Sequence, residues 1–174
     1  MAPRQLPLRR ILVVCTANQC RSPMAEGLLR ARLAEADLQS VIEVSSAGTW
    51  TGDGIPATDH AVTTLAECGI DIGGHRSREV TEELLAGADL VLAMTSGHVQ
   101  AMASEFPAAR DKILLFSTLM GGTWDVADPV GGTPEDYRAT ARLLEDLIAA
   151  GWSTIIGSEG QGAEFLAAAI GAAG

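Results

Sequence analysis

The chain has 174 residues, of which 47% are hydrophobic and 20% are charged. This balance fits a globular domain with a sizeable core and excludes an intrinsically disordered chain. Twelve basic and 22 acidic residues give a net charge of −10, so we expect no nucleic-acid partner.

Three cysteines, Cys15, Cys20 and Cys68, cannot build a disulfide framework, and their odd number favours a reducing compartment. No apolar run approaches the roughly 18 residues that a membrane span needs. The opening stretch MAPRQLPLRR lacks the apolar segment of a signal peptide. We therefore expect a cytoplasmic protein with no membrane partner.

Short apolar runs alternate with helical patterns along the chain. Strands are expected at residues 10–14, 41–45, 88–94 and 112–116, and helices at residues 22–36, 57–68, 80–87, 96–105 and 134–150. Ser22 is the expected N-cap of the first helix, Gly69 ends the second and Thr81 caps the third. The alternation predicts an α/β fold: a three-layer sandwich in which helices cover both faces of a four-stranded parallel sheet.

The pattern indicates a single domain over residues 1–174, with a core at about residues 9–150. The remaining residues, 151–174, read as a C-terminal extension that we expect to be partly disordered, with a short helix at 161–170 as the alternative. The Gly-rich stretch at 121–136 is expected to be a loop.

The stretch VCTANQCRSPMAE, residues 14–26, joins the first strand to the first helix. Unpaired N–H groups at a helix start, together with the helix dipole, form an anion site and favour the thiolate of Cys15. The planar guanidinium of Arg21 can bind two oxygens of a tetrahedral oxyanion. These parts suit the transfer of a phosphoryl group to sulfur, although the spacing alone also allows a buried cysteine and a surface arginine.

The same stretch resembles the active-site loop of the low-molecular-weight protein tyrosine phosphatases, whose pattern is V-C-x-G-N-x-C-R-S-P-x-A-E. It departs from that pattern at Ala17, where glycine is usual. Further similar segments follow in the same order: SSAGT (45–49), GIDIGGHRSREVT (69–81), ADLVLAM (88–94) and DPVGG (128–132). The resemblance covers about residues 9–150. It implies a flavodoxin-like fold and hydrolysis of phosphotyrosine through a cysteinyl-phosphate intermediate.

The resemblance also implies roles for matching residues. Cys15 is the implied nucleophile, Arg21 binds the phosphoryl oxygens, and Asp128 is the general acid that protonates the leaving oxygen. Asp125 lies close in sequence, but the D-P-x-G context favours Asp128. The implied phosphate-binding and supporting residues are Thr16, Ala17, Asn18, Gln19, Cys20, Ser22, Ser46 and His75.

Three of the supporting residues have a more specific implied role. Ser22 assists the departure of the Cys15 sulfur, in addition to capping the helix. Asn18 holds a strained loop conformation. Cys20 either traps an oxidised Cys15 as a disulfide or fills the core.

Two positions bear on the substrate. Gln19 stands where eukaryotic-type tyrosine phosphatases tend to carry an aliphatic residue and bacterial protein-arginine phosphatases carry threonine. Val130 stands where many relatives have Tyr or Phe. Trp50 and Trp124, expected at the mouth of the site, either replace that ring or cover the edge of the core. Several segments look closer to the bacterial arginine-phosphatase branch, which makes protein-arginine phosphatase the alternative function.

Two other hypotheses remain. A thioredoxin-linked arsenate reductase shares the fold and the loop, but it needs two further cysteines near residues 80–90, which this chain lacks. A non-catalytic phosphate-binding module would not need Cys15, Arg21 and Asp128 together.

No metal or cofactor is expected, because thiolate catalysis needs none and the three histidines are scattered. The expected partners are a phosphorylated protein or peptide as substrate and inorganic phosphate as product. The protein itself is expected to be a monomer or a weak dimer.

Overall fold

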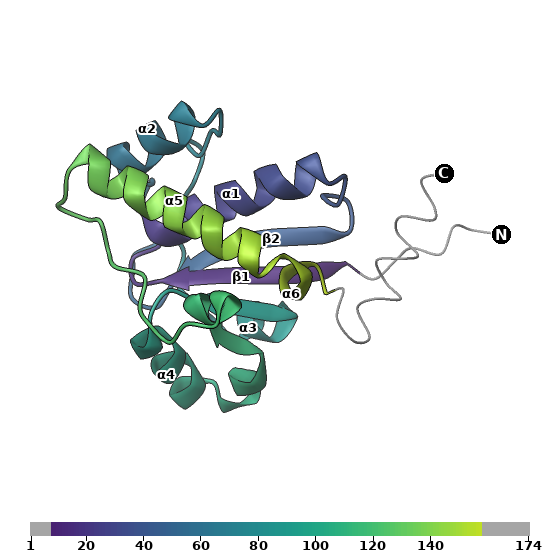
Figure 1. The fold of residues 1–174 in the computed structure, drawn as a ribbon. Coiled ribbons are helices and arrows are strands. Elements are labelled where there is room, and N and C mark those ends of the chain that lie inside the picture. Colours follow the sequence, from purple (N-terminus) through teal and green to yellow (C-terminus); the bar gives the residue numbers. More distant parts are fainter. Residues whose placement is uncertain (1–7, 158–174) are drawn as a thin grey trace.

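The computed structural model describes residues 8–157, which form one four-stranded parallel sheet with helices on both faces (Figure 1). The strands are β1 (Arg9–Cys15), β2 (Ile42–Gly48), β3 (Leu90–Ala93) and β4 (Ile113–Leu115). They lie in the order β2-β1-β3-β4, and every neighbouring pair is parallel. The predicted α/β fold is therefore confirmed.

The helices follow the predicted pattern closely. They are α1 (Arg21–Glu35), α2 (Asp59–Glu67), α3 (Glu82–Gly87), α4 (Ser96–Glu105), α5 (Pro134–Ala150) and α6 (Trp152–Ile156), with two 3-10 helices, η1 (Pro107–Lys112) and η2 (Phe116–Met120). The two 3-10 helices and α6 are absent from the elements predicted from the sequence. The predicted helix at 161–170 lies outside the described residues.

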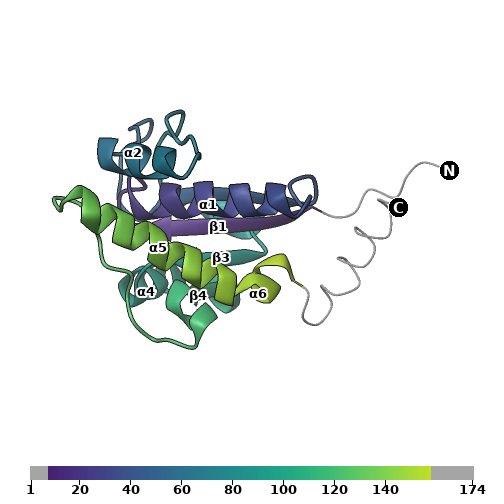
Figure 2. The same ribbon diagram turned by 45° about the horizontal axis from the view of Figure 1, so that its top comes forward.

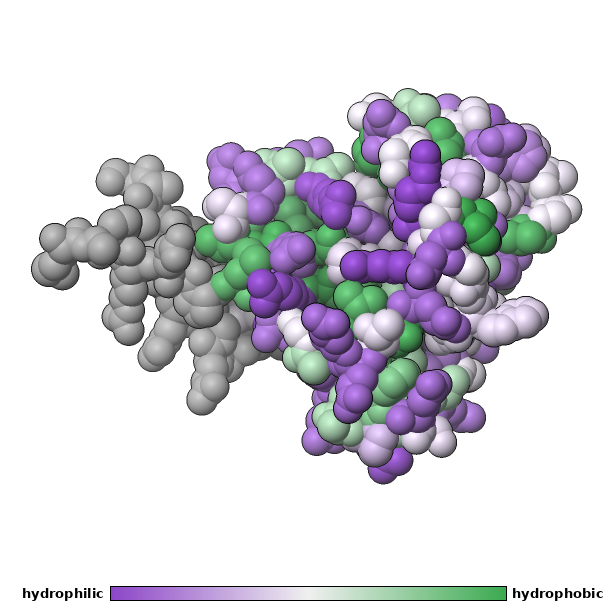
Figure 3. Space-filling model, turned by 180° about the vertical axis from the view of Figure 1, so that it is seen from behind, coloured by the Kyte–Doolittle hydropathy of each residue, from purple (hydrophilic) through white to green (hydrophobic). Residues whose placement is uncertain are grey.

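Side chains of β1 alternate between two buried layers, as a strand covered on both faces requires. Ile11, Val13 and Cys15 join the core that contains side chains of α1 and α5, whereas Leu12 and Val14 join the core beneath α3 and α4. Figure 2 shows α1 and α5 running across one face of the sheet. Seen from behind, the described surface is mostly hydrophilic, with smaller apolar patches between (Figure 3).

Threonine side chains begin four of the helices. The hydroxyl of each accepts a hydrogen bond from an N–H in the first turn, at α2 (Thr58), α3 (Thr81), α4 (Thr95) and α5 (Thr133). The predicted cap at Thr81 is confirmed. Gly69 follows the end of α2 with a φ of 76°, a conformation that glycine adopts without strain.

The sheet order creates a topological switch point between β1 and β3. From β1 the chain crosses to β2 on one side, and from β3 it crosses to β4 on the other. Ligands of open parallel sheets bind outside the carboxyl ends of the strands at such a point. Cys15 is the last residue of β1, so the fold places its loop at this location.

Candidate active site

The Cys15 loop, residues 15–21, is tied to the segment 49–58 through its carbonyl groups. The carbonyl oxygens of Cys15, Thr16 and Gln19 accept hydrogen bonds from backbone N–H groups of that segment at 2.8 to 3.0 Å. Across a trans peptide the next N–H points in the opposite direction to the C=O. The N–H groups of residues 16, 17 and 20 therefore point away from the segment, as donors available to an anion.

The thiol of Cys15 lies against the hydroxyl of Ser22. The two atoms are 3.0 Å apart, and both residues are buried. Ser22 does not cap α1, because the helix begins at Arg21 and its N-cap, Cys20, makes no capping bond with its side chain. The predicted capping role of Ser22 is thus wrong. Its hydroxyl turns instead toward Cys15 and the amide of Asn18.

Asn18 is fully buried and has a left-handed φ of 54°. Its side-chain Nδ2 donates to the hydroxyls of Ser22 and Ser46, both at 2.9 Å, and its Oδ1 accepts from the N–H of Arg78 at 3.0 Å. His75 Nε2 donates to the Asn18 carbonyl oxygen at 2.7 Å. The structure thus brings Ser46 and His75 together around Asn18, and these bonds hold the loop in a conformation that asparagine tolerates better than most residues.

The guanidinium of Arg21 is buried beside the loop, with only 4% of the residue exposed. Its Nη1 donates to the carbonyl of Val126 at 2.9 Å, and its Nη2 donates to the carboxylate of Asp128 at 3.1 Å and to Thr16 Oγ1 at 3.5 Å. Its Nε is buried and has no partner among the described residues. Because a buried donor without an acceptor is costly, this edge of the guanidinium is suited to an oxygen of a bound anion.

Asp128 reaches the site from the loop between η2 and α5. One of its carboxylate oxygens accepts from the N–H of Val130 at 3.1 Å, while the other binds Arg21. Asp125 is engaged elsewhere, because its carboxylate accepts from the N–H of Ser96 at the start of α4. The structure therefore places Asp128, and not Asp125, next to the guanidinium.

Gly48 lets β2 approach the Cys15 loop closely. It pairs with Cys15 in the sheet register, and a Cβ built on it would lie only 2.4 Å from the carbonyl oxygen of Thr16. Any side chain there would push the loop away from the sheet. The position of the loop therefore depends on the absence of a side chain at residue 48.

A model of the family described as low molecular weight phosphotyrosine protein phosphatase matches residues 10–159. The chain belongs to this family. A protein-arginine-phosphatase of Geobacillus stearothermophilus is 44% identical over 80% of this chain and 90% of its own length. A low molecular weight protein-tyrosine-phosphatase of Streptomyces coelicolor is 35% identical over 78% of this chain and 87% of its own length.

Solved structures of similar proteins have the same fold. A low molecular weight protein tyrosine phosphatase from T. tengcongensis has a TM-score of 0.80 at 42% identity, covering 84% of this chain and 99% of that one. A mutant of the YwlE arginine phosphatase with a phosphorylated active site serine has a TM-score of 0.81 at 38% identity, covering 88% of this chain and 99% of that one. The low molecular weight phosphatase family thus includes similar proteins named for phosphotyrosine and for phosphoarginine.

The residues expected at the mouth of this phosphatase expose apolar surface. Trp50 is 81% exposed, and its N–H is bonded to the Thr16 carbonyl, which places it directly beside the Cys15 loop. Val130 follows the Asp-Pro pair and is also exposed, as is Trp124. Within the loop itself, Ala17 and Gln19 are half-buried.

Cys20 is a free, buried thiol whose sulfur lies 3.6 Å from Thr58 Oγ1. The hydroxyl of Thr58 in turn lies 3.4 Å from that of Tyr137 on α5. Burial raises the pKa of Cys20 above its ordinary value, and the hydrogen bonds from Tyr137 and Thr58 offset this only in part. A disulfide between Cys20 and Cys15 remains a prediction.

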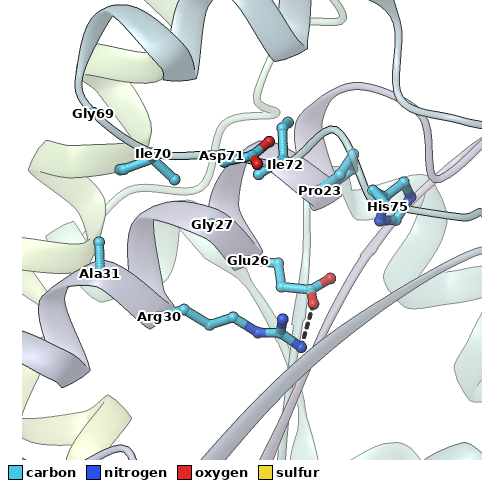
Figure 4. Close-up of a pocket in the computed structure, with 10 residues that line it drawn as sticks. All are labelled: Pro23, Glu26, Gly27, Arg30, Ala31, Gly69, Ile70, Asp71, Ile72 and His75. Carbon is cyan, nitrogen blue, oxygen red and sulfur yellow. Dashed lines mark ion pairs between the residues drawn. The ribbon is translucent and has the colours of Figure 1, made fainter.

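Glu26 extends the hydrogen-bond network behind the loop. One carboxylate oxygen accepts from the hydroxyl of Ser46, and the other lies 2.7 Å from Arg30 on the same helix. Figure 4 shows this ion pair on the wall of a cavity of about 370 Å³ between α1 and the segment 69–75. No role at the site was predicted for Glu26, although it is the final glutamate of the loop pattern.

His98 is the second residue at the site that sequence reasoning missed. It lies on α4, it is buried, and its Nε2 is 2.8 Å from Thr16 Oγ1. Burial and the nearby Arg21 charge lower the pKa of His98 to about 4. Its position just after β3, the strand beside β1, is the signal that could have pointed to the site.

Within residues 8–157, no His, Cys, Asp and Glu side chains form a group of three or more that is able to hold a metal ion. In the same part of the chain, every helix is too short or too polar to cross a membrane.

Proposed function

We propose that this family member is a cysteine-dependent protein phosphatase that hydrolyses phosphotyrosine. The observation that carries the proposal is the meeting of three groups at the switch point of the sheet. The Cys15 sulfur is hydrogen-bonded to Ser22, the buried Arg21 guanidinium has an Nε without a partner in residues 8–157, and the Asp128 carboxylate is paired with Arg21. A nucleophile, an oxyanion clamp and an acid are the parts that phosphoryl transfer to sulfur requires.

In the proposed first step, Arg21 and the loop N–H groups bind the phosphoryl oxygens, and the Cys15 thiolate attacks phosphorus. The P–S bond forms as the P–O bond to the substrate breaks. Asp128 gives its proton to the leaving oxygen, so that the product leaves as a neutral phenol.

In the proposed second step, Asp128 takes a proton from a water molecule that attacks the cysteinyl phosphate. The P–S bond breaks, the thiolate is regenerated and inorganic phosphate is released. The Ser22 hydroxyl, 3.0 Å from the sulfur, stabilises the negative charge that returns to it.

The exposed indole of Trp50 supports an aromatic substrate. Its backbone N–H is bonded to the Thr16 carbonyl of the Cys15 loop and its side chain is 81% exposed, so an indole next to the loop is open to stacking on a phenyl group.

Phosphoarginine in proteins is the second candidate substrate. It is favoured by the similarity to two proteins named protein-arginine-phosphatase, at 44% and 45% identity, and by Val130, which offers no ring to an aryl substrate. A guanidinium group also stacks well on an indole face, so Trp50 serves this substrate too.

The two substrates are separated by phosphate release from peptides of one sequence that carry phosphotyrosine or phosphoarginine at the same position. We expect a higher kcat/KM for the phosphotyrosine peptide and no turnover of either peptide by a Cys15→Ser variant. A strong preference for phosphoarginine would establish the second candidate. Turnover that survives in the Cys15→Ser variant, or its absence in the wild-type protein, would overturn the proposed function.

A further inference from the structure

We propose that His98 is a positioning residue for phosphoryl binding, which acts through the Thr16 hydroxyl on the guanidinium of Arg21. This inference rests on the proposed function of the Cys15 site. The three side chains form a chain of contacts: His98 Nε2 lies 2.8 Å from Thr16 Oγ1, which accepts from Arg21 Nη2 at 3.5 Å.

The fold brings His98 to the loop from the neighbouring strand. Thr95 caps α4 by accepting a hydrogen bond from the His98 N–H at 3.1 Å, which fixes the backbone of the histidine. The N–H of Met94 is bonded to the carbonyl of Val14 at 3.0 Å, so the end of β3 is tied to β1 just before Cys15. His98 is therefore held in place at the carboxyl ends of β1 and β3, where the site lies.

The surroundings of the two ring nitrogens indicate which of them carries the proton in the neutral imidazole of His98. Nδ1 of His98 is buried and has no partner among the described residues. A proton on Nδ1 would leave a buried donor unsatisfied, which is rarer and more costly than an unsatisfied acceptor. The neutral ring thus carries its proton on Nε2 and donates it to Thr16 Oγ1, and the lowered pKa of His98 is in keeping with a neutral ring.

This arrangement matters when Asp128 acts as an acid. In the present structure Arg21 Nη2 donates to both Asp128 and Thr16. To reach a leaving oxygen, the carboxylate must give up its bond to Nη2. Thr16 then remains the protein acceptor for one hydrogen of Nη2, while the other hydrogen and Nε–H face the phosphoryl oxygens. A hydroxyl fixed by His98 keeps the guanidinium in the orientation for this bidentate contact.

The test compares two variants that break the chain of contacts at different points. Thr16→Val removes the hydroxyl with little change of volume, and His98→Leu removes the imidazole donor. His98→Gln keeps an amide nitrogen close to the position of Nε2, and Gln100→Leu is the control on an exposed position of the same helix. Phosphate binding is measured as protection of Cys15 from iodoacetate by inorganic phosphate, read by mass spectrometry of the Cys15 peptide. This readout does not depend on turnover.

We expect His98→Leu and Thr16→Val each to raise the phosphate concentration for half-protection by about tenfold. The double variant should be no worse than the weaker-binding single variant, because both changes remove one chain of contacts. His98→Gln should recover binding to within about threefold of wild type, and Gln100→Leu should match wild type.

Three outcomes overturn the inference: unchanged phosphate protection in Thr16→Val, losses that multiply in the double variant, or a His98→Gln variant as weak as His98→Leu. Thr16→Val leaves His98 in place, so unchanged protection in this variant overturns the inference even if His98→Leu does not fold. Failure of the proposed function is recognised separately, as a wild-type protein that binds phosphate but releases none from either peptide.

Discussion

Substitution of Gly48 by alanine tests whether close contact between β2 and the Cys15 loop sets the geometry of the site. The added Cβ would lie 2.4 Å from the Thr16 carbonyl oxygen, whereas Cβ atoms essentially never come closer than 3.0 Å to such an atom. The loop must therefore move by at least about 0.6 Å. That oxygen also accepts the N–H of Trp50, so the movement strains the tie to the segment 49–58 as well.

The size of the effect follows from this displacement. A misplacement of about 1 Å in an active site can lower the rate by about 100-fold, so we expect kcat/KM of Gly48→Ala to fall by about 10- to 100-fold. Overpacking of a close contact costs about 1–3 kcal/mol of the free energy of unfolding. For a chain of this length, each kcal/mol lowers Tm by about 2–4 °C.

The assay is hydrolysis of an aryl phosphate together with thermal unfolding of the same preparations. Gly87→Ala, at the end of α3, is the matched control, since a Cβ there meets no atom within 4 Å. It should keep wild-type activity and Tm. A Gly48→Ala variant with wild-type kcat/KM would refute the argument that this contact sets the position of the loop.

Three further predictions follow from single side chains. Asp128→Asn should slow the hydrolysis of aryl phosphates with poor leaving groups more than those with good ones, and equal slowing in a series of leaving groups would contradict its role as the acid. Because the folded state holds the pKa of His98 at about 4, against about 6.5 when unfolded, only the unfolded state gains a proton as pH falls through this range, and stability should fall. After allowance for screening by solvent, the free energy of unfolding should fall by about 1–2 kcal/mol. Urea unfolding at several pH values should show this fall in wild type and not in His98→Gln. Burial and a raised pKa should make Cys20 react with iodoacetamide far more slowly than the exposed Cys68, and equal rates by peptide mass spectrometry would contradict the packing around Cys20.

The sheet and most helices were predictable because their signals are local. The alternation of apolar runs with amphipathic segments predicts parallel strands joined by helices, and the caps at Thr81 and after α2 follow from nearest neighbours. The predicted N-cap at Ser22 was wrong because the contacts that decide it are not local to the start of the helix. A capping rule reads only the residues that follow, whereas the Ser22 hydroxyl is engaged by Cys15 and Asn18 from the preceding loop.

The site was predictable where one motif contains its parts, and not where the fold assembles them. Cys15 and Arg21 stand in one loop, so their proximity followed from the sequence. His98 is 82 residues from Thr16, and only the neighbouring positions of β1 and β3 bring the two together. The close approach of Gly48 to the loop likewise depends on the register of β2 with β1, which no local pattern specifies.

Cys15, the proposed nucleophile, is the last residue of β1, a strand that lies between two neighbouring strands and whose residues from Ile11 onward are almost completely buried. A thiol anchored in this way cannot move independently of the sheet, so the Cys15 loop should not unfold before the rest of the domain. Phosphate protection of Cys15 and the folded fraction should decline along one curve in a urea titration. Separate curves would show that the loop opens as an independent unit, and they would make local opening a route to its oxidation.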